Sequence, residues 1–286
     1  MSPDKIRTFF LINMKTVGIQ GIKGSYHDQV AKDYFGKSLI VNEFLSFDDL
    51  ALSVNKGESE FGVMAIENSI AGSIIPNYAL IDSHDLYIVG EYFININHQL
   101  MVLPGSKIDD IKYVSSHPMA LLQCKRFFKK YPHITLVEEK DTAEVAKRIS
   151  ENNVKDTAAV ASVQAAKIYD LDIISKNIQT IKKNQTRFVI VSKNKIKNGG
   201  LLNKASLKFS LSHETGSLAL VLNILKKYNL NLTKIQSLPI IEIPWKYSFF
   251  VDTTFISIDD FNNAVNIIKN EAESLKVLGV YKNQMK

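Results

Sequence analysis

The chain has 286 residues, which exceeds the usual size of one compact core and therefore predicts two domains. Apolar residues make up 45% and charged residues 22% of the sequence, so the chain is globular rather than disordered. The formal net charge of +6 is spread along the chain, with no basic stripe interleaved with aromatic residues, which argues against a nucleic-acid-binding protein. A small anionic substrate fits this modest positive excess better.

A single cysteine excludes an internal disulfide framework and a cysteine-rich zinc site, and it favours a reducing cytoplasm. The six histidines show no metal-ligand spacing, so we expect no metal and no other cofactor. The apolar run at residues 8–13 is too short for a signal peptide or a membrane span, so no membrane partner is expected. Met14 competes with Met1 as the start of the protein, because the first strand-like pattern begins just after it.

Short apolar runs alternate with amphipathic helical patterns from residue 15 to about residue 193. The predicted strands cover residues 15–21, 60–66, 112–116, 135–139 and 158–161. The predicted helices cover residues 26–35, 120–131, 142–152 and 162–169. This alternation is typical of parallel sheets with helices on both faces.

Residues 192–204 combine lysines with a Gly-Gly pair and no apolar period, which indicates a linker. Beyond this linker we predict strands at residues 205–211, 232–241, 247–251 and 275–280, with a turn at Pro244. One predicted helix follows the SHETG turn, and the other is N-capped by Asp259 and runs to about residue 274. The order βαββαβ is that of a ferredoxin-like sandwich.

Several predicted strands of the first half end in Gly, Ser, Thr or Asn just before a helix begins. These loops contain Gly24, Ser25, Asn68, Ser69, Ser116, His117, Asp141, Thr142 and Ser162. In a parallel sheet such loops gather at the carboxyl edge, and helix N-termini there offer unpaired N–H groups to an anion. Simple helix capping explains each loop taken alone. Together the loops favour a pocket for a polyanion or a small dicarboxylate.

Arg187 stands beside Thr186 at the start of an apolar strand. A guanidinium in this place can hold a carboxylate through two parallel hydrogen bonds. An ordinary arginine at a strand end is the alternative.

Segments in both halves resemble known families. Six segments, in order, resemble blocks of the prephenate dehydratases: GIKGSYHDQVA (21–31), FGVMAIENSIAGSI (61–74), SSHPMALLQC (115–124), DTAEVA (141–146), AAVASVQAAKIYDL (158–171) and NQTRFVIVSK (184–193). Two later segments resemble an ACT domain of the phenylalanine-sensing kind: TGSLALVLNIL (215–225) and NLTKIQSLP (231–239). The chain departs from the family pattern at Lys23, His27, Met119, Gln236 and Leu238.

The resemblance implies an α/β fold: a two-lobed, doubly wound catalytic domain like a periplasmic binding protein at residues 15–193, then a ferredoxin-like ACT domain at 205–280. It implies a lyase that removes carbon dioxide and the ring hydroxyl from prephenate, giving phenylpyruvate for phenylalanine biosynthesis. L-phenylalanine is the implied feedback effector. Thr186 is expected to donate a hydrogen bond to the departing hydroxyl, Arg187 to fix a carboxylate and Phe188 to pack beside the ring.

The other predicted site residues form two groups. The substrate-binding group is Gly24, Ser25, Tyr26, Asn68, Ser69, Gly72, Ser116, His117, Asp141, Thr142, Ala143 and Ser162. The effector-binding group is Gly216, Ser217, Leu218, Asn231, Leu232, Ser237, Leu238 and Pro239. We expect His117 to orient a loop rather than act as a general acid, Glu67 to organise its turn, and Cys124 to lie in the core.

Two other functions remain open. Arogenate dehydratase is the same reaction on the amino acid analogue, and no single residue decides between the two substrates. A non-catalytic sensor of small anions is the more distant alternative, because the fold alone never proves activity. We expect a homodimer or homotetramer, and we expect chorismate mutase activity to come from a separate protein.

Overall fold

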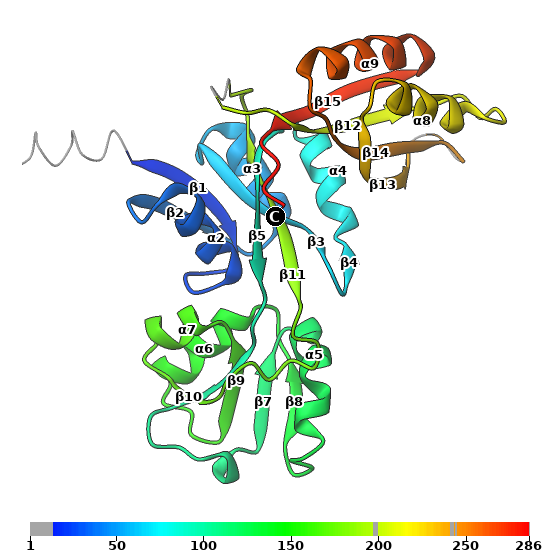
Figure 1. The fold of residues 1–286 in the computed structure, drawn as a ribbon. Helices are drawn as coiled ribbons and strands as arrows, with labels where there is room; N and C mark the ends of the chain where they lie inside the picture. The colour runs from blue at the N-terminus through cyan, green and yellow to red at the C-terminus, as the bar shows by residue number, and fades with distance from the viewer. Residues whose placement is uncertain (1–13, 197–199, 241–242, 244, 286) are drawn as a thin grey trace, which may run out of the picture. The chain divides into compact units, whose positions relative to one another are not determined.

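The computed structural model describes residues 14–196, 200–240, 243 and 245–285. It divides into two compact units, one formed by Met1–Ile74 with Phe93–Phe188 and the other by Ile75–Tyr92 with Val189–Lys286 (Figure 1). The second unit therefore contains residues 75–92 in addition to the segment that resembles an ACT domain. The apolar run at 8–13 and the predicted turn at Pro244 lie outside the described residues.

The first sheet has the strand order β2-β1-β3-β11-β5, with the short β4 paired to β3. Its strands are β1 (Lys15–Gln20), β2 (Leu39–Phe44), β3 (Phe61–Asn68), β4 (Gly72–Ser73), β5 (Tyr87–Asn95) and β11 (Gln185–Ser192). The helices α2 (Tyr26–Phe35) and α3 (Phe47–Lys56) connect the parallel strands β1, β2 and β3. The structure confirms the predicted helix at 26–35, whereas β2 and α3 were not predicted.

The second sheet has the order β10-β6-β9-β7-β8. Its strands are β6 (Gln99–Val102), β7 (Tyr113–Ser116), β8 (Thr135–Glu138), β9 (Thr157–Ala161) and β10 (Asp172–Ser175). The predicted strands β7, β8 and β9 are parallel to one another, whereas β6, which was not predicted, runs antiparallel to both β9 and β10. The chain enters this sheet at β6, directly from β5 of the first sheet and without an intervening helix.

Helices cover both faces of this second sheet (Figure 1). Helix α5 (Pro118–Phe128) packs on one face, and α6 (Thr142–Glu151) and α7 (Val163–Ile168) pack on the other. Strand β9 shows the alternation, because Ala158 and Val160 join the α5 cluster while Ala159 and Ala161 join the α6–α7 cluster. Cys124 is buried in the α5 cluster, as expected.

The chain from residue 204 forms a four-stranded antiparallel sheet of order β13-β14-β12-β15. Its elements are β12 (Lys204–Ser210), α8 (Ser217–Lys227), β13 (Asn231–Pro239), β14 (Tyr247–Thr254), α9 (Ile258–Glu271) and β15 (Ser274–Tyr281). This confirms the predicted βαββαβ order. The predicted N-cap of α9 is wrong by two residues: Ser257 caps the helix by accepting from the Asp260 N–H, and Asp259 lies in the first turn.

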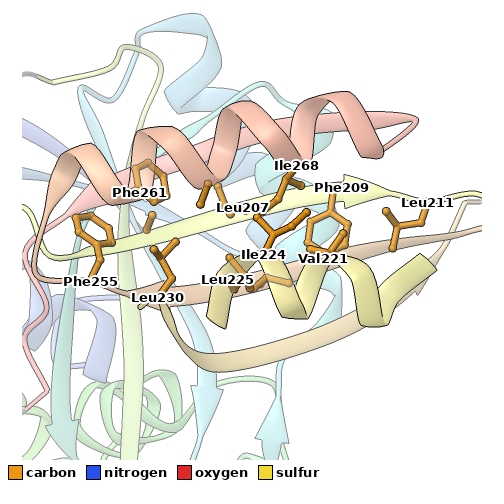
Figure 2. Packing of buried hydrophobic residues seen from close by; sticks show 13 residues of the cluster. Leu207, Phe209, Leu211, Val221, Ile224, Leu225, Leu230, Phe255, Phe261 and Ile268 are labelled. Atoms are coloured by element: carbon orange, nitrogen blue, oxygen red, sulfur yellow. The ribbon is translucent and has the colours of Figure 1, made fainter. Parts of the chain in front are cut away.

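The two helices α8 and α9 pack on one face of this sheet (Figure 2). Alternate residues of β12, Leu207 and Phe209, point toward the helices and meet Ile224 and Ile268 there (Figure 2). The apolar residues that recur at helical spacing along α8 therefore form the face of the helix that is buried in this core.

Helix α4 (Ile75–Ser83), which was not predicted, belongs to the same compact unit as this sheet and contacts its strands. The Tyr78 ring meets the Phe250 ring edge-on, with 5.5 Å between the ring centroids. Near the end of the helix, the Asp82 carboxylate forms ion pairs with Lys208 of β12 and Lys276 of β15. Helix α4 thus contacts both apolar and charged groups of this sheet.

A close approach of two backbones makes Gly279 of β15 indispensable. A Cβ atom at Gly279 would lie 2.0 Å from the Ile88 carbonyl oxygen and 2.8 Å from its carbon, and backbone atoms cannot move aside cheaply. We expect Gly279→Ala to lower the free energy of unfolding by about 1–3 kcal/mol or more. Urea unfolding followed by circular dichroism measures this loss.

The matched control is Gly200→Ala, because no atom lies within 4 Å of a Cβ placed there. That variant should stay within about 0.5 kcal/mol of the wild type. Equal unfolding midpoints for the two alanine variants would contradict the assigned contact between Gly279 and Ile88.

Candidate functional site

A cavity of about 360 Å³ lies in the first compact unit, lined by residues of the first sheet, of the β5–β6 connection and of several helix starts. Among the predicted site residues, it brings together Ser25, Tyr26, Asn68, His117, Asp141, Thr142, Thr186 and Phe188. The lining also contains residues that were not predicted: Gln20, His27, Phe47, Ala65, Ala71, Ile74, Ile96, His98, Met119, Ala120, Gln123 and Lys140. Most of the unpredicted residues are apolar or amide side chains, which carry no signature of chemistry in a single sequence.

Helices α2, α5 and α6 all begin at this cavity. Ser25 caps α2 by accepting from the Asp28 N–H at 3.2 Å, and His117 Nδ1 caps α5 by accepting from the Met119 N–H at 3.2 Å. Asp141 Oδ1 caps α6 by accepting from two N–H groups at 2.9 Å each. Helix capping and a convergence of helix dipoles are thus both present, and the dipoles favour an anion in the cavity.

Thr186 receives a hydrogen bond from Asn68, whose orientation is fixed by the main chain. Asn68 Oδ1 accepts from the N–H groups of Ile70 and Ala71 at 2.9 Å each, so the amide nitrogen of Asn68 must face the other way. Asn68 Nδ2 then donates to Thr186 Oγ1 at 2.8 Å. Because the Thr186 oxygen accepts this bond, its own hydrogen remains available to donate to a group in the cavity.

The network continues through two more amide side chains. Asn68 Nδ2 also donates to Asn184 Oδ1 at 2.7 Å, and Asn184 Nδ2 donates to Gln123 Oε1 at 2.8 Å. Neither Asn184 nor Gln123 was among the predicted residues. Both stand inside segments that resemble family blocks, Asn184 at the start of NQTRF and Gln123 near the end of SSHPMALLQC.

The residues around Thr186 divide between the two faces of β11. Thr186 and Phe188 line the cavity, whereas Arg187, between them, does not. Side chains alternate along a strand, so Arg187 leaves β11 on the opposite face, where it is 6% exposed. This geometry does not favour the predicted contact between Arg187 and a substrate carboxylate; the helix N-termini are better placed for it.

The cavity wall beside Phe188 is formed by His27, which stands where the resembling family has serine. The His27 ring meets the Phe188 ring edge-on, with 5.0 Å between centroids, and lies 5.3 Å from the Phe47 ring. Burial lowers the pKa of His27 to about 3, so the imidazole is neutral at physiological pH. His27 therefore extends an aromatic wall rather than adding a charge.

Burial also sets the protonation of His117 and Asp141. It lowers the pKa of His117, and it raises the pKa of Asp141 although two N–H groups oppose that shift. Since His117 Nδ1 accepts a main-chain N–H, the hydrogen of the neutral ring is on Nε2. His117 is thus a neutral side chain whose main contact caps a helix.

The other predicted substrate residues lie outside the cavity lining and hold the loops in place. Ser162 Oγ donates to the Gly24 carbonyl at 2.6 Å, and Ser116 Oγ donates to the Val160 carbonyl at 2.6 Å. Ser69 Oγ accepts from the Gln185 N–H at 2.9 Å. Gly72 pairs with Asn68 in the hairpin of β3 and β4, and Ala143 is buried in α6.

The predicted effector residues fall at two ends of the second unit's sheet. Ser217, at the start of α8, lines a cavity of about 320 Å³ together with Tyr247 and Phe249 of β14. Pro239 and Ser237 pair with those two β14 residues, so Gly216, Leu218 and Leu238 also lie toward this end. Asn231 and Leu232 line a separate cavity of about 510 Å³ beyond the end of α8.

The described residues contain no group of three or more His, Cys, Asp or Glu side chains arranged to hold a metal ion. None of the helices in this part of the chain has the length and apolar character needed to cross a membrane.

Comparisons with curated proteins point to one family. A bifunctional chorismate mutase/prephenate dehydratase of Buchnera aphidicola is 34% identical over 92% of this chain and 70% of the relative. An arogenate dehydratase/prephenate dehydratase of Arabidopsis thaliana is 38% identical over 93% of this chain and 72% of the relative.

Solved structures share the fold over nearly the whole chain. A prephenate dehydratase from Arthrobacter aurescens in complex with L-Phe has a TM-score of 0.86 and 22% identity, covering 94% of this chain and 90% of that one. A protein described as a novel type of quorum quenching acylase also has a TM-score of 0.86, with 27% identity over 94% of this chain and 98% of that one. These likenesses confirm the predicted fold class. The family described as prephenate dehydratase matches residues 17–196, and the chain belongs to this family.

Proposed function

We propose that this protein is a prephenate dehydratase, a lyase that converts prephenate to phenylpyruvate on the route to phenylalanine. The observation that carries the proposal is the hydrogen bond from Asn68 Nδ2 to Thr186 Oγ1 at 2.8 Å, at a cavity where three helices begin. It supports a threonine hydroxyl that is held as an acceptor on one side and is available as a donor on the other.

The reaction needs little covalent help from the protein. Electrons of the bond between the ring and its carboxylate move into the ring as carbon dioxide leaves, and the ring hydroxyl departs from the opposite carbon. The product ring is aromatic, which supplies the driving force. The protein must hold two carboxylates and stabilise the departing hydroxyl, whose negative charge grows in the transition state.

Thr186 fits the second task. The hydrogen bond from a preorganised hydroxyl to the departing oxygen becomes stronger as negative charge develops on that oxygen. One such donor lowers the barrier by about 3–4 kcal/mol. A threonine is a very weak acid, so hydrogen bonding rather than full proton transfer is its role. The substrate carboxylates are held by main-chain N–H groups at the starts of α2, α5 and α6. These helices have N-cap side chains, but the positive ends of their dipoles still favour an anion.

Prephenate is favoured over arogenate because of Asp141, the one carboxylate among the described residues that line the cavity. Arogenate carries an ammonium group, and a positive charge in a cavity needs an anionic side chain near it. Asp141 Oδ1 already accepts two N–H groups of α6, and burial raises its pKa. A side chain with that environment is a poor counterion for an ammonium group.

Acylase activity, which the description of the other structural neighbour names, finds less support in this cavity. Hydrolysis by a serine nucleophile needs a histidine in hydrogen-bond contact with the hydroxyl. Ser25, the serine that lines the cavity, accepts from the Asp28 N–H as a helix cap, and none of the cavity histidines of the described chain is its hydrogen-bond partner.

The C-terminal part of the proposal is regulatory. Residues 205–280 act as an ACT domain that binds L-phenylalanine and lowers activity, supported by the βαββαβ order and by the complex of the structural neighbour with L-Phe. Ser217 and the Ser237–Pro239 end of β13 are the favoured effector residues, because they lie toward the same cavity. We further propose a cytoplasmic homodimer or homotetramer.

One experiment tests the whole proposal. The purified full-length protein is assayed for product from prephenate and from arogenate, each with and without millimolar L-phenylalanine. We expect prephenate to be the better substrate and phenylalanine to lower its turnover. No aromatic product from either substrate would reject the enzyme in favour of an anion sensor, and turnover insensitive to phenylalanine would reject the regulatory part alone.

A further inference from the structure

His98 lies in the short connection between β5 and β6 and contacts the network that ends at Thr186. Its side chain is almost completely buried, and its Nε2 is 3.0 Å from Gln123 Oε1. The same oxygen accepts from Asn184 Nδ2 at 2.8 Å, which identifies it as the acceptor end of the Gln123 amide. His98 Nε2 must therefore carry the hydrogen and donate to Gln123.

The other ring nitrogen of His98 faces Tyr26. Tyr26 OH donates to the Asn97 carbonyl at 2.9 Å, and its oxygen is 3.5 Å from His98 Nδ1. Burial lowers the pKa of His98, so the ring is neutral and has a single hydrogen, which the contact with Gln123 places on Nε2. The tautomer of His98 is thus fixed by its surroundings.

The main chain at His98 is anchored independently of the imidazole. The His98 N–H donates to Gln179 Oε1 at 3.0 Å, and the His98 carbonyl accepts from the Ile178 N–H at 2.9 Å. A change of the side chain alone should leave the backbone in place. The imidazole contact with Gln123 can therefore be tested without moving the β5–β6 connection.

We infer that His98 is a positioning residue for the dehydration, acting through Gln123, Asn184 and Asn68 on the Thr186 hydroxyl. Its Nε2–H holds the Gln123 oxygen toward Asn184, which turns the Asn184 oxygen toward Asn68. Asn68 in turn donates to Thr186 and leaves the Thr186 hydrogen directed to substrate. This role rests on the proposed function, because its consequence is measured as turnover.

Two amide replacements separate the two ring nitrogens. In His98→Gln the amide nitrogen takes nearly the place of Nε2 and retains a donor for Gln123, whereas in His98→Asn the shorter amide stands near Nδ1 and loses it. We expect His98→Asn to lower kcat for prephenate about tenfold, the effect of one hydrogen bond, with KM changed less than about twofold. His98→Gln should retain kcat within about threefold of the wild type.

Further measurements distinguish positioning from a merely structural role. Thermal unfolding of both variants shows how far stability changes, and nitrogen chemical shifts of the wild-type ring should report the Nε2–H tautomer. Unaltered kcat in His98→Asn, or an equal loss in both variants, would overturn the positioning role. A wild-type protein with no prephenate turnover would overturn the proposed function and this role together, so the two failures are distinguishable.

Discussion

Replacement of Thr186 by alanine should lower kcat for prephenate about a hundredfold or more and leave the fold intact. The variant removes the hydroxyl to which Asn68 donates at the cavity, and with it the donor that we propose for the departing oxygen. Thr186 is only 6% exposed, yet alanine removes few atoms from the strand, so the sheet should persist. Steady-state kinetics with far-ultraviolet circular dichroism as a check of folding measures both effects.

Two further variants isolate the hydroxyl from the methyl group. Thr186→Ser keeps the hydroxyl and should retain much of the turnover, whereas Thr186→Val keeps the shape and should resemble the alanine variant. An alanine or valine enzyme that keeps more than about a tenth of wild-type kcat would show that another group stabilises the leaving oxygen.

Lys204→Met should lower the free energy of unfolding by about 3–5 kcal/mol, because it removes a buried cation that contacts a buried carboxylate. Lys204 Nζ lies 2.8 Å from Glu91 Oε2, and the two side chains are 4% and 0% exposed. Glu91 Oε1 also accepts from the Gln284 N–H at 3.0 Å, so the carboxylate remains held in place when the lysine is gone. Urea unfolding at neutral pH measures the loss.

The second substitution Glu91→Gln, added to Lys204→Met, tests the cause. It removes the buried charge that lost its contact with Lys204 and keeps an acceptor for Gln284, so the double variant should be more stable than Lys204→Met alone. The exposed pair of Lys147 and Glu151, 3.9 Å apart on α6, is the matched control. Lys147→Met should cost at most about 0.5 kcal/mol. A Lys204→Met loss no larger than that would contradict the assigned burial of the pair.

Local patterns in the sequence were sufficient for much of the fold. Helix α2 matches its predicted bounds because its cap and its periodicity are both local signals. Helix α4 was missed because its own apolar residues are spread around the helix and form no amphipathic stripe, and because its second residue is proline. Strand β6 was missed because its four residues are too short a run to show a period in the sequence.

The candidate site was only partly visible for the same reason. Thr186 and Asn68 are separated by 118 residues, and only the fold places their side chains 2.8 Å apart. Gln123, Asn184 and His98 are ordinary polar residues in sequence, and their connection to Thr186 arises from tertiary contacts alone. The role expected of Arg187 stays a prediction: residues adjacent along a strand point to opposite faces, and Thr186 and Phe188 are the residues of β11 on the cavity face.

The packing of α4 on the sheet of the second unit limits how the protein can be dissected. A fragment cut at the linker, residues 200–286, would lack Tyr78, Ile81 and Ile88, which are buried in the intact chain. Lys208 and Lys276 would lose Asp82, and Lys204 would lose Glu91. The C-terminal segment is thus not a detachable module, and a fragment prepared in this way should aggregate or remain partly unfolded. Residues 75–92, although far away in sequence, are as much a part of its folding unit as its own strands.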